Sequence, residues 1–443
     1  MPAFLLKFEC FFHVLMLCAL PDYASMLRPM PFNALGLAPE LLQALKPKSY
    51  PAPTPVQSES IPPVLEGRDV LVSAPTGSGK TAAYALPLLQ RWISASLAHL
   101  DTPHTRARAS PQALILLPTR ELAVQVGQTF RSLAVHLPKA CKITVVFGGV
   151  SINPQMMGLR GGCDILVATP GRLLDLMAHN AVQLQGLESL VLDEADRLLD
   201  LGFQDELSQI LAVLPARRQT LFFSATLPES VLTLSQTLLN KPVRVDVMPQ
   251  APQPSVIMQR AILVDRTQRT QLLKHLMTHE GWRQVLVFAA TQHACDMVAT
   301  KLRNAGISAE PFHGQLSQGK RSQVLADFKA GRLKVVLSTD LASRGIDIQN
   351  LPCVVNFDLP RSAVDYTHRI GRTGRAGQAG DALSFVSPST QAHWHLIEKR
   401  HAVQLKLEVL PGFEPTEPVP VADPTGGVKG LRPSKKDKLR RSF

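Results

Sequence analysis

The chain has 443 residues, of which 45% are hydrophobic and 19% are charged. This balance excludes a disordered chain and allows two or three packed domains. Lysine and arginine outnumber the acids by 47 to 35, and the net charge of +12 fits a polyanionic partner without proving one. None of the six cysteines forms a CxxC pair, which argues against a zinc site and favours a reducing, cytoplasmic compartment.

Residues 1–26 form an apolar extension that differs from the rest of the chain. Residues 3–20 are strongly apolar, but charged residues such as Lys7 interrupt them, so a spanning helix is not expected. A signal peptide would carry its positive charge before the apolar run, whereas Lys7 lies inside it. We therefore expect a start codon set too early, with translation beginning at Met26 or Met30. A disordered or membrane-touching extension is the alternative.

The first motif with a clear chemical meaning is APTGSGKT, which follows strand-like DVLVS and precedes helix-like AAYALPLL. In this context glycines let backbone N–H groups face phosphates, and the helix N-terminus adds its dipole. The lysine reaches the β- and γ-phosphate oxygens, and the threonine offers a hydroxyl to Mg²⁺. The predicted nucleotide-binding residues of this loop are Ala74, Pro75, Thr76, Gly77, Ser78, Gly79, Lys80 and Thr81.

From Val70 onward, short apolar runs alternate with longer helical segments. The runs that end in a small or polar cluster are DVLVSAPTG, ALILLPTR, ITVVFGG, DILVATPGR, SLVLDEAD and TLFFSAT. Near-continuous apolar runs between helices predict parallel strands that are covered on both faces. In such sheets ligands lie just beyond the carboxyl ends of the strands, which is where the motif residues fall.

The run SLVLDEAD places acids directly after a strand that should be buried. Burying carboxylates is costly unless something positive meets them, and a nucleotide-bound metal ion provides that charge. We predict that Asp193 holds the Mg²⁺ and that Glu194 polarises the attacking water. The alternative is a solvated acidic helix start, since acids are favoured in a first turn.

A proline-rich stretch, VMPQAPQPS, interrupts the pattern, and strand-like runs then resume in QVLVFAAT, KVVLSTD, CVVNFD and DALSFV. The predicted organisation is an apolar extension (1–26), a first domain (27–247), a linker (248–255), a second domain (256–410) and a proline-rich, then basic and disordered tail (411–443). The basic end of the tail suits a sequence-blind RNA tether or a merely solubilising segment.

In the second half, HRIGRTGR packs three arginines and a histidine into His368 to Arg375. Alone, this segment fits a phosphate-contacting surface or a salt-bridged face. With a nucleotide site in the other domain, it indicates arginine fingers, which stabilise charge on the γ-phosphoryl group by about 10³ to 10⁵ in rate.

Taken together, these motifs resemble those of the DEAD-box RNA helicases of superfamily 2, in the family's order and over roughly Phe32 to Val386. The resemblance implies an α/β fold of two tandem RecA-like domains, each a parallel sheet flanked by helices, with ATP between them and RNA across both. It implies an RNA-stimulated ATPase that grips the RNA backbone, unwinds short duplexes locally or remodels RNA–protein complexes. The short lead-in to Phe32 and the basic tail resemble the bacterial RhlE-like branch, which implies ribosome assembly or RNA turnover.

The same resemblance implies roles for individual residues. Beside the phosphate loop, the nucleotide is expected to contact Phe32, Tyr50, Gln57 and Asp347. The catalytic set is Lys80, Asp193, Glu194, His368, Arg372 and Arg375, with Thr81 and Asp193 holding the metal. RNA contacts are expected from Pro118, Thr119, Arg120, Gly149, Thr169, Gly171, Arg172, Arg321 and Thr339. Hydrolysis is linked to strand separation by Asp196, Ser224 and Thr226.

The expected cofactors are ATP and Mg²⁺, and the expected partner is structured or duplex RNA, recognised without sequence specificity. Ribosome precursors or RNA-degradation machinery follow as partners by analogy alone. We expect a cytoplasmic monomer without stable membrane association. Two other functions remain open: a DNA-directed helicase of the same superfamily, and an ATP-gated RNA clamp or assembly scaffold that does not unwind.

Overall fold

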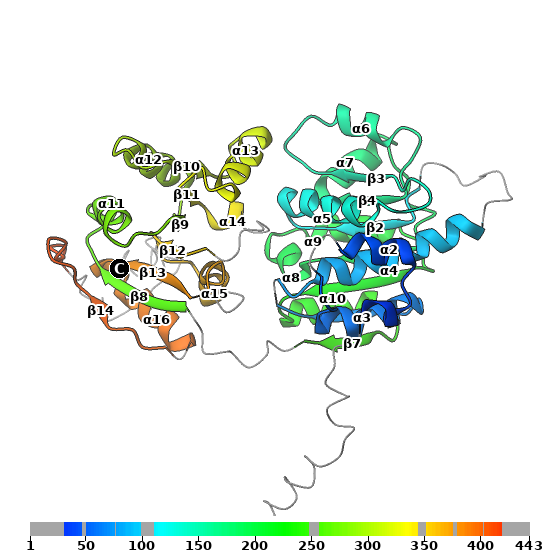
Figure 1. Ribbon diagram of the computed structural model, residues 1–443, viewed down its shortest axis with the longest axis horizontal. Helices are drawn as coiled ribbons and strands as arrows, with labels where there is room; N and C mark the ends of the chain where they lie inside the picture. Colours follow the sequence, from blue (N-terminus) through cyan, green and yellow to red (C-terminus); the bar gives the residue numbers. More distant parts are fainter. Residues whose placement is uncertain are drawn as a thin grey trace, which may run out of the picture. The chain divides into compact units, whose positions relative to one another are not determined.

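The computed structural model describes residues 31–46, 50–75, 77–98, 110–247, 257–343, 351–374, 379–401 and 403–418. These residues form two compact units, which are residues 31–247 (unit 1) and residues 257–418 (unit 2) (Figure 1). The apolar extension, the linker and the basic end of the tail lie outside the described residues, as do Thr76, Asp347 and Arg375. Within the described ranges, no helix combines the length and the apolar character needed to cross a membrane.

Unit 1 is built on one sheet of seven strands, in which every neighbouring pair runs parallel. The strands are β1 (Val70–Ser73), β2 (Ala113–Leu116), β3 (Ile143–Val146), β4 (Ile165–Ala168), β5 (Ser189–Leu192), β6 (Gln219–Ser224) and β7 (Val243–Asp246). Their order across the sheet is β3-β4-β2-β5-β6-β1-β7. The strands that lead into the phosphate loop, the DEAD segment and the SAT segment are therefore adjacent.

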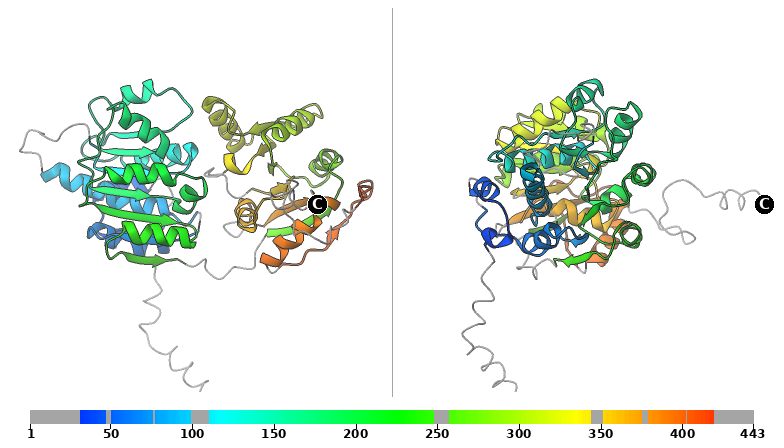
Figure 2. Two further views of the ribbon diagram at one scale, coloured as in Figure 1. Left: turned by 180° about the vertical axis from the view of Figure 1, so that it is seen from behind. Right: turned by 90° about the vertical axis from the view of Figure 1, so that its right-hand side faces the viewer.

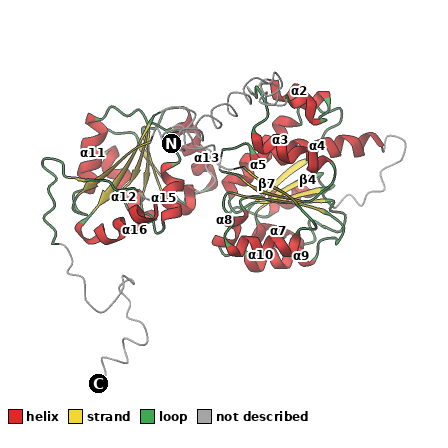
Figure 3. Cartoon of the chain, turned by 90° about the horizontal axis from the view of Figure 1, so that it is seen from below, coloured by secondary structure: helices red, strands yellow, loops and turns green. Residues whose placement is uncertain are grey.

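Helices cover both faces of this sheet. They are η1 (Phe32–Leu35), α2 (Pro39–Leu45), α3 (Pro55–Leu65), α4 (Lys80–Ala98), α5 (Arg120–Leu133), α6 (Asn153–Leu159), α7 (Pro170–Ala178), α8 (Ala195–Asp200), α9 (Gln204–Ala212) and α10 (Glu229–Leu238). Figure 3 shows α3 and α4 on one side of the strands and α7, α9 and α10 on the other. Along β1, Val70 and Val72 pack into the core of one face and Leu71 into the core of the other. This alternation confirms the prediction that apolar runs form strands buried on both sides.

Unit 2 repeats the topology of unit 1. Its strands are β8 (Ile257–Leu263), β9 (Val285–Phe288), β10 (Ala309–Phe312), β11 (Val335–Ser338), β12 (Cys353–Asn356), β13 (Gly380–Val386) and β14 (Leu407–Glu408). They pair in parallel in the order β10-β11-β9-β12-β13-β8-β14, so adding seven to each strand number of the first sheet gives the second. The prediction of two parallel sheets flanked by helices is confirmed.

The helices of unit 2 also cover both faces of its sheet (Figure 2). They are α11 (Arg269–His279), α12 (Gln292–Arg303), α13 (Gln318–Lys329), α14 (Asp340–Ser343), α15 (Ala363–Ile370), η3 (Pro388–Thr390) and α16 (Gln391–His401). Helices α12, α13 and α15 are preceded by the cap residues Thr291, Ser317 and Ser362, whose hydroxyls accept a hydrogen bond from a first-turn N–H. Such caps satisfy N–H groups that have no acceptor within the helix, and they fix where each loop ends.

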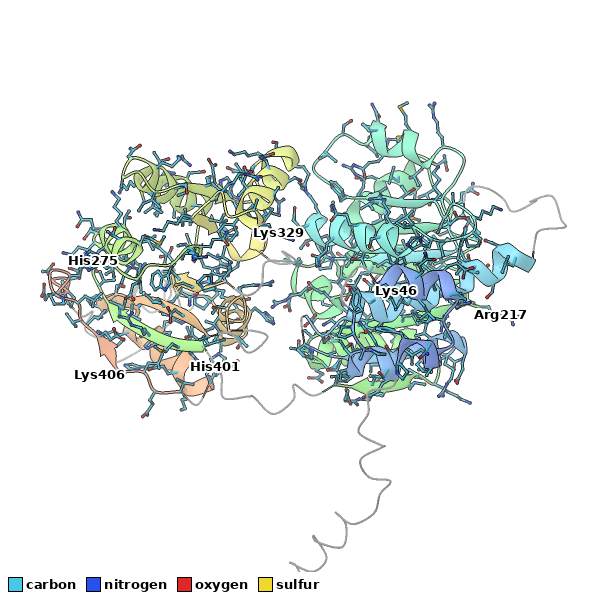
Figure 4. The ribbon with its side chains drawn as sticks, in the orientation of Figure 1. Lys46, Arg217, His275, Lys329, His401 and Lys406 are labelled. Atoms are coloured by element: carbon cyan, nitrogen blue, oxygen red, sulfur yellow. The ribbon has the colours of Figure 1, made fainter. Side chains whose placement is uncertain are left out.

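The segment of residues 403–418, here called the strap, differs from the sequence-based expectation. Residues from 411 onward were assigned to a disordered tail, yet the strap is ordered on unit 2. Its strand β14 pairs with β8, and the ring of Phe413 lies 5.4 Å from that of His275, which Figure 4 labels on α11. Asp265 accepts hydrogen bonds from Thr416 N and Thr416 Oγ1, both at 2.7 Å, and from Glu417 N at 3.1 Å. These contacts hold the strap although its sequence has no periodic pattern.

Candidate active site

The loop after β1 carries the predicted phosphate-binding residues of unit 1. Ala74 N donates to the Ser224 carbonyl over 3.1 Å, so the loop leaves the sheet alongside β6. Gly77 and Gly79 have φ angles of 83° and 95°, a left-handed backbone that glycine adopts without strain. Lys80 begins α4, is buried, and donates from Nζ to the Ala74 carbonyl over 2.6 Å. The loop therefore curls around its own lysine.

The residues of this loop fit a phosphate group. The buried Ser78 Oγ makes no hydrogen bond with the described part of the chain. The N-terminus of α4, a helix of 19 residues, points its first N–H groups and its dipole at the loop. The buried ammonium of Lys80 adds a full positive charge. A hydroxyl without a partner, helix N–H groups and an ammonium are the donors that phosphate oxygens require.

Gln57 connects α3 to the phosphate loop. Its Oε1 accepts from Thr54 N over 3.0 Å, and its Nε2 donates to the Gly79 carbonyl over 3.1 Å. These two bonds use half of the hydrogen-bonding capacity of the Gln57 amide, and the side chain is fully buried. The rings of Phe32 and Tyr50 meet edge to face with centroids 6.2 Å apart, and burial raises the pKa of Tyr50. A β-carbon at Gly79 would collide with the Gln57 amide, so glycine is required there.

Asp193 follows β5 directly and is buried at 4% exposure. Its Oδ2 accepts from the hydroxyl of the fully buried Tyr84 over 2.8 Å, and its Oδ1 accepts from Glu194 N over 2.9 Å. Burial raises the pKa of Asp193, while the nearby Lys80 ammonium and these two bonds lower it. A carboxylate held from two directions beside an ammonium is suited to bind a hard cation.

Glu194 lies between β5 and α8 with φ and ψ both at 50°. This left-handed conformation is uncommon for a residue with a side chain and stores strain. It turns the chain sharply from the strand into the helix at the second of the two adjacent acids. The strained turn between Asp193 and Glu194 is consistent with different roles for the two acids.

Asp196 joins the DEAD segment to the SAT segment. Its Oδ2 accepts from Thr226 N over 3.1 Å and from Thr226 Oγ1 over 2.8 Å. Its backbone N donates to Ser224 Oγ over 3.3 Å, and that hydroxyl donates to the Thr226 carbonyl over 2.6 Å. The structure thus brings together all three residues that were predicted to couple hydrolysis to strand separation.

The predicted RNA-contacting residues of unit 1 gather at the carboxyl ends of β2, β3 and β4. Thr119 caps α5 and is followed by Arg120, whose guanidinium lies so close to Gly149 that a β-carbon there would collide with it. Thr169 Oγ1 accepts from Gly148 N over 3.4 Å. Pro118 is buried before this cap, and Gly171 lies in the first turn of α7 with open space beside it.

Arg172 is buried on α7, and its Nη2 donates to the Val150 carbonyl over 2.7 Å. Its Nε lies 3.4 Å from the Asp175 carboxylate, outside good hydrogen-bond geometry. The buried Nε and Nη1 groups have no hydrogen-bond partner in the described part of the chain, which is energetically costly.

In unit 2, the predicted RNA residues belong to α13 and to the end of β11. Arg321 is buried at 4% exposure, with its guanidinium carbon 5.1 Å from the centre of the Phe312 ring. Thr339 follows β11, and its carbonyl accepts from Ser338 Oγ over 3.1 Å. Arg321 is thus buried within its own unit, whereas Thr339 is half-buried.

The arginines of HRIGRTGR do not share one environment. Arg369 is buried and pairs with both oxygens of Asp340, at 2.5 and 2.7 Å, and it donates from Nη1 to Asn356 Oδ1 over 3.0 Å. It therefore anchors α15 to the sheet, and it is not one of the two arginines, Arg372 and Arg375, that are expected to act as fingers. His368 and Arg372 are half-buried.

Two side chains at the site were missed from the sequence. Tyr84 stands within the apolar pattern of α4, so it resembles an ordinary core residue, and only the fold shows its hydroxyl on Asp193. Gln155 makes three hydrogen bonds to the loop that contains Gly149. A lone glutamine in a short helix gives no signal in a single sequence.

Two family models match the chain. Residues 54–234 match the DEAD/DEAH box helicase family, and residues 268–377 match the helicase conserved C-terminal domain. The ATP-dependent rRNA helicase rrp3 of Emericella nidulans is 40% identical over 85% of this chain and 78% of that protein. The DEAD-box ATP-dependent RNA helicase CshA of Streptococcus pneumoniae is 38% identical over 85% of this chain and 69% of that protein.

Solved structures of similar fold include ligand complexes. Dbp5 of S. cerevisiae bound to RNA and ADP BeF3 has a TM-score of 0.73 at 29% identity, over 86% of this chain and 95% of that one. Mss116p bound to ssRNA and AMP-PNP has a TM-score of 0.74 at 26% identity, over 86% of this chain and 80% of that one.

Proposed function

Because the chain belongs to the DEAD-box family of ATP-dependent RNA helicases, we propose how its own residues divide the work of an RNA-stimulated ATPase. The proposal rests on a set of interacting residues in unit 1 that runs from the phosphate loop through the DEAD segment to the SAT segment. The ammonium of Lys80 and the carboxylate of Asp193 interact electrostatically. Asp196, three residues after Asp193, is hydrogen-bonded to Ser224 and Thr226 of the SAT segment. Nucleotide binding and the SAT segment are therefore linked through a few bonds.

We assign the binding of ATP to the phosphate loop and to Gln57. Loop N–H groups, Ser78 Oγ and Lys80 would contact the phosphates, and the remaining hydrogen-bonding atoms of Gln57 would contact the adenine edge. For this, Lys80 Nζ has to leave the Ala74 carbonyl for a phosphate oxygen. Thr81 and Asp193 would hold Mg²⁺, which when bound neutralises charge on the phosphates.

Glu194 is proposed as the residue that orients and deprotonates the attacking water. It follows Asp193 directly at a strained turn of the backbone, and the proposal gives the metal to the first acid and the water to the second. By resemblance, Arg372 and Arg375 are proposed to stabilise the γ-phosphate charge, His368 to brace them, and Asp347 to contact the ribose.

RNA is proposed to lie along backbone-contacting residues rather than base-reading ones. In unit 1 these are Arg120, Gly149, Thr169 and Arg172, of which Arg172 has buried N–H groups without hydrogen-bond partners. In unit 2, Arg321 and Thr339 are the corresponding candidates. Contacts of this kind position the strand without reading its sequence. ATP and RNA should then strengthen each other's binding, because each favours the same state of the protein.

The pathway, the subfamily, the compartment and the domain limits are further parts of the proposal. The similarity to a protein named as an rRNA helicase supports ribosome assembly as a pathway, and RNA turnover stays an analogy. The relatives described above are of the CshA and rrp3 kind, so membership of the RhlE-like branch rests on the short lead-in and basic tail alone. We also propose a cytoplasmic monomer whose domain limits are 27–247 and 256–410, extended by the strap.

The proposed role of Glu194 is tested by Glu194→Gln. This change keeps the size of the side chain and removes the base, so RNA-stimulated turnover should fall by about 10² to 10⁴. Affinity for Mg·ATP, measured by a fluorescent nucleotide analogue, should stay close to that of the unchanged protein, and RNA should be released more slowly with ATP present. Glu229→Gln, at an exposed position at the start of α10, is the matched control. Turnover near normal in Glu194→Gln would refute the assignment.

A further inference from the structure

The 147–151 loop, between β3 and α6, is one of the most open parts of the proposed RNA surface. It contains Gly148 and Gly149, and Gly149 is exposed with a φ of 75°. Two consecutive glycines have more backbone freedom than any other pair, so holding them in one conformation costs conformational entropy. Contacts from residues outside the loop therefore have to offset this entropic cost.

Three side chains hold the loop by its backbone, two from the start of α7 and one from α6. Thr169 accepts from Gly148 N, and Arg172 donates to the Val150 carbonyl over 2.7 Å. The third is Gln155 on α6. Its Oε1 accepts from Phe147 N over 2.9 Å, while its Nε2 donates to the carbonyls of Phe147 and Ser151 over 3.1 and 3.3 Å. Gln155 therefore closes the loop from its first residue to its last.

The chemistry of these bonds requires an amide. The Phe147 backbone offers a donor and an acceptor to the same side chain, and only a group with both functions pairs with both. A carboxylate would accept from Phe147 N but would face two carbonyl oxygens with negative charge. An apolar side chain of the same length would leave all three backbone groups to water.

We propose that Gln155 is a positioning residue for RNA binding, whose amide holds the 147–151 loop in the shape that presents Gly149 to the RNA backbone. This inference rests on the proposed function of the loop. The fold itself depends little on Gln155, because Leu159 is the buried residue of α6 and Gln155 is half-exposed. A change at Gln155 should therefore alter RNA affinity far more than stability.

The test uses two variants of the full chain, Gln155→Glu and Gln155→Met. Binding of a fluorescent single-stranded RNA is measured by anisotropy with Mg²⁺ and a non-hydrolysable ATP analogue. Both variants should bind RNA about tenfold more weakly or worse, since each loses the hydrogen bonds that order the loop. Nucleotide affinity without RNA and the thermal midpoint should stay unchanged within error. Gln209→Glu, at an exposed position of α9, controls for the added charge.

The pH dependence of Gln155→Glu separates positioning from charge. A protonated glutamic acid has one O–H donor and a carbonyl acceptor, so it can restore the bond from Phe147 N and one of the two bonds to carbonyl oxygens. RNA affinity relative to the unchanged protein should therefore recover in part as pH falls from about 7.5 to about 4.5, close to the ordinary glutamate pKa of about 4.3. Gln155→Met should show no such recovery.

The outcomes distinguish this inference from the proposed function. Wild-type affinity for RNA in Gln155→Met would overturn the positioning role while leaving the proposed function intact. A loss in Gln155→Glu that Gln209→Glu reproduces would also overturn it. If the unchanged protein bound no RNA in the presence of the ATP analogue, both the inference and the proposed function would fall.

Discussion

Asp193 shows how one residue is prepared for a ligand at an energetic cost. A buried carboxylate is unfavourable, and burial raises the pKa of Asp193, yet the side chain is held by Tyr84 and by Glu194 N. The cost is tolerable if a cation completes the site. The same reasoning explains why Lys80 is buried beside it.

The hydroxyl of Tyr84 is predicted to contribute to the stability of unit 1. Tyr84→Phe removes the donor to a buried carboxylate and should lower the free energy of unfolding by about 1.5 to 3 kcal/mol in the absence of nucleotide. Tyr366→Phe is the matched comparison in unit 2, since the buried Tyr366 donates to the neutral Gln259 Oε1 over 2.9 Å. Tyr366→Phe should lower the free energy of unfolding by only about 0.5 to 1.5 kcal/mol. Denaturant unfolding checks this, and equal costs would contradict the special role of Asp193.

For single residues, the sequence predicts those that belong to a local motif with a known chemical role. Gly77, Lys80 and Asp193 could be assigned because a phosphate loop and a strand followed by acids are local patterns. Tyr84 and Gln155 could not, because each acts on a segment far away or on backbone atoms, and such contacts exist only after folding. The ion pair of Arg369 with Asp340 could not be predicted for the same reason, because the fold brings the two residues together.

Among the elements, the strap is the one that sequence patterns failed to place. Alternating apolar runs predict strands such as β5 and β6 well, because burial on both faces leaves a strong signal. Within the strap, β14 is a short strand of two residues. The strap is held in place by hydrogen bonds to Asp265, which lies 151 residues before Thr416 in the chain. A long-range contact of this kind leaves no periodic trace.

Docking of the strap should depend on the charge of Asp265. Burial raises the pKa of Asp265, but the bonds from Thr416 and Glu417 outweigh it, and the net pKa is lowered. A lowered pKa means stabilisation that is present above the unfolded value, about 3.9, and lost as pH falls through the folded value. The protection factors of the Thr416 and Glu417 amides, which are corrected for the pH dependence of intrinsic exchange, should therefore stay high near neutral pH and fall only in acid.

Asp265→Asn provides the test of that element at neutral pH. It removes the charge and replaces one accepting oxygen with a donor, so exchange at both amides should accelerate about tenfold or more. Amides in the central strand β9 should be unaffected and serve as the internal control. Unchanged protection of Thr416 would show that the strap is held by its packing alone.

For the whole molecule, the repeated strand order places functional segments at the carboxyl edges of two similar sheets. One sheet carries the phosphate loop and the DEAD and SAT segments, and the other carries α13, α14 and α15. A net charge of +12 adds a general attraction for nucleic acid that falls with salt. Topology was predictable because parallel βα units allow few arrangements, whereas the limits of the strap were not.

The central claim is that these residues make the chain an RNA helicase driven by ATP hydrolysis. The most direct measurement is strand displacement of a short RNA duplex by the full chain, with ATP, without nucleotide, and with Glu194→Gln in place of the unchanged protein. Displacement should require ATP, Glu194→Gln should not support multiple turnovers, and a DNA duplex of the same sequence should show no comparable activity. Tight ATP-dependent RNA binding without any strand displacement would contradict the claim and identify a clamp instead.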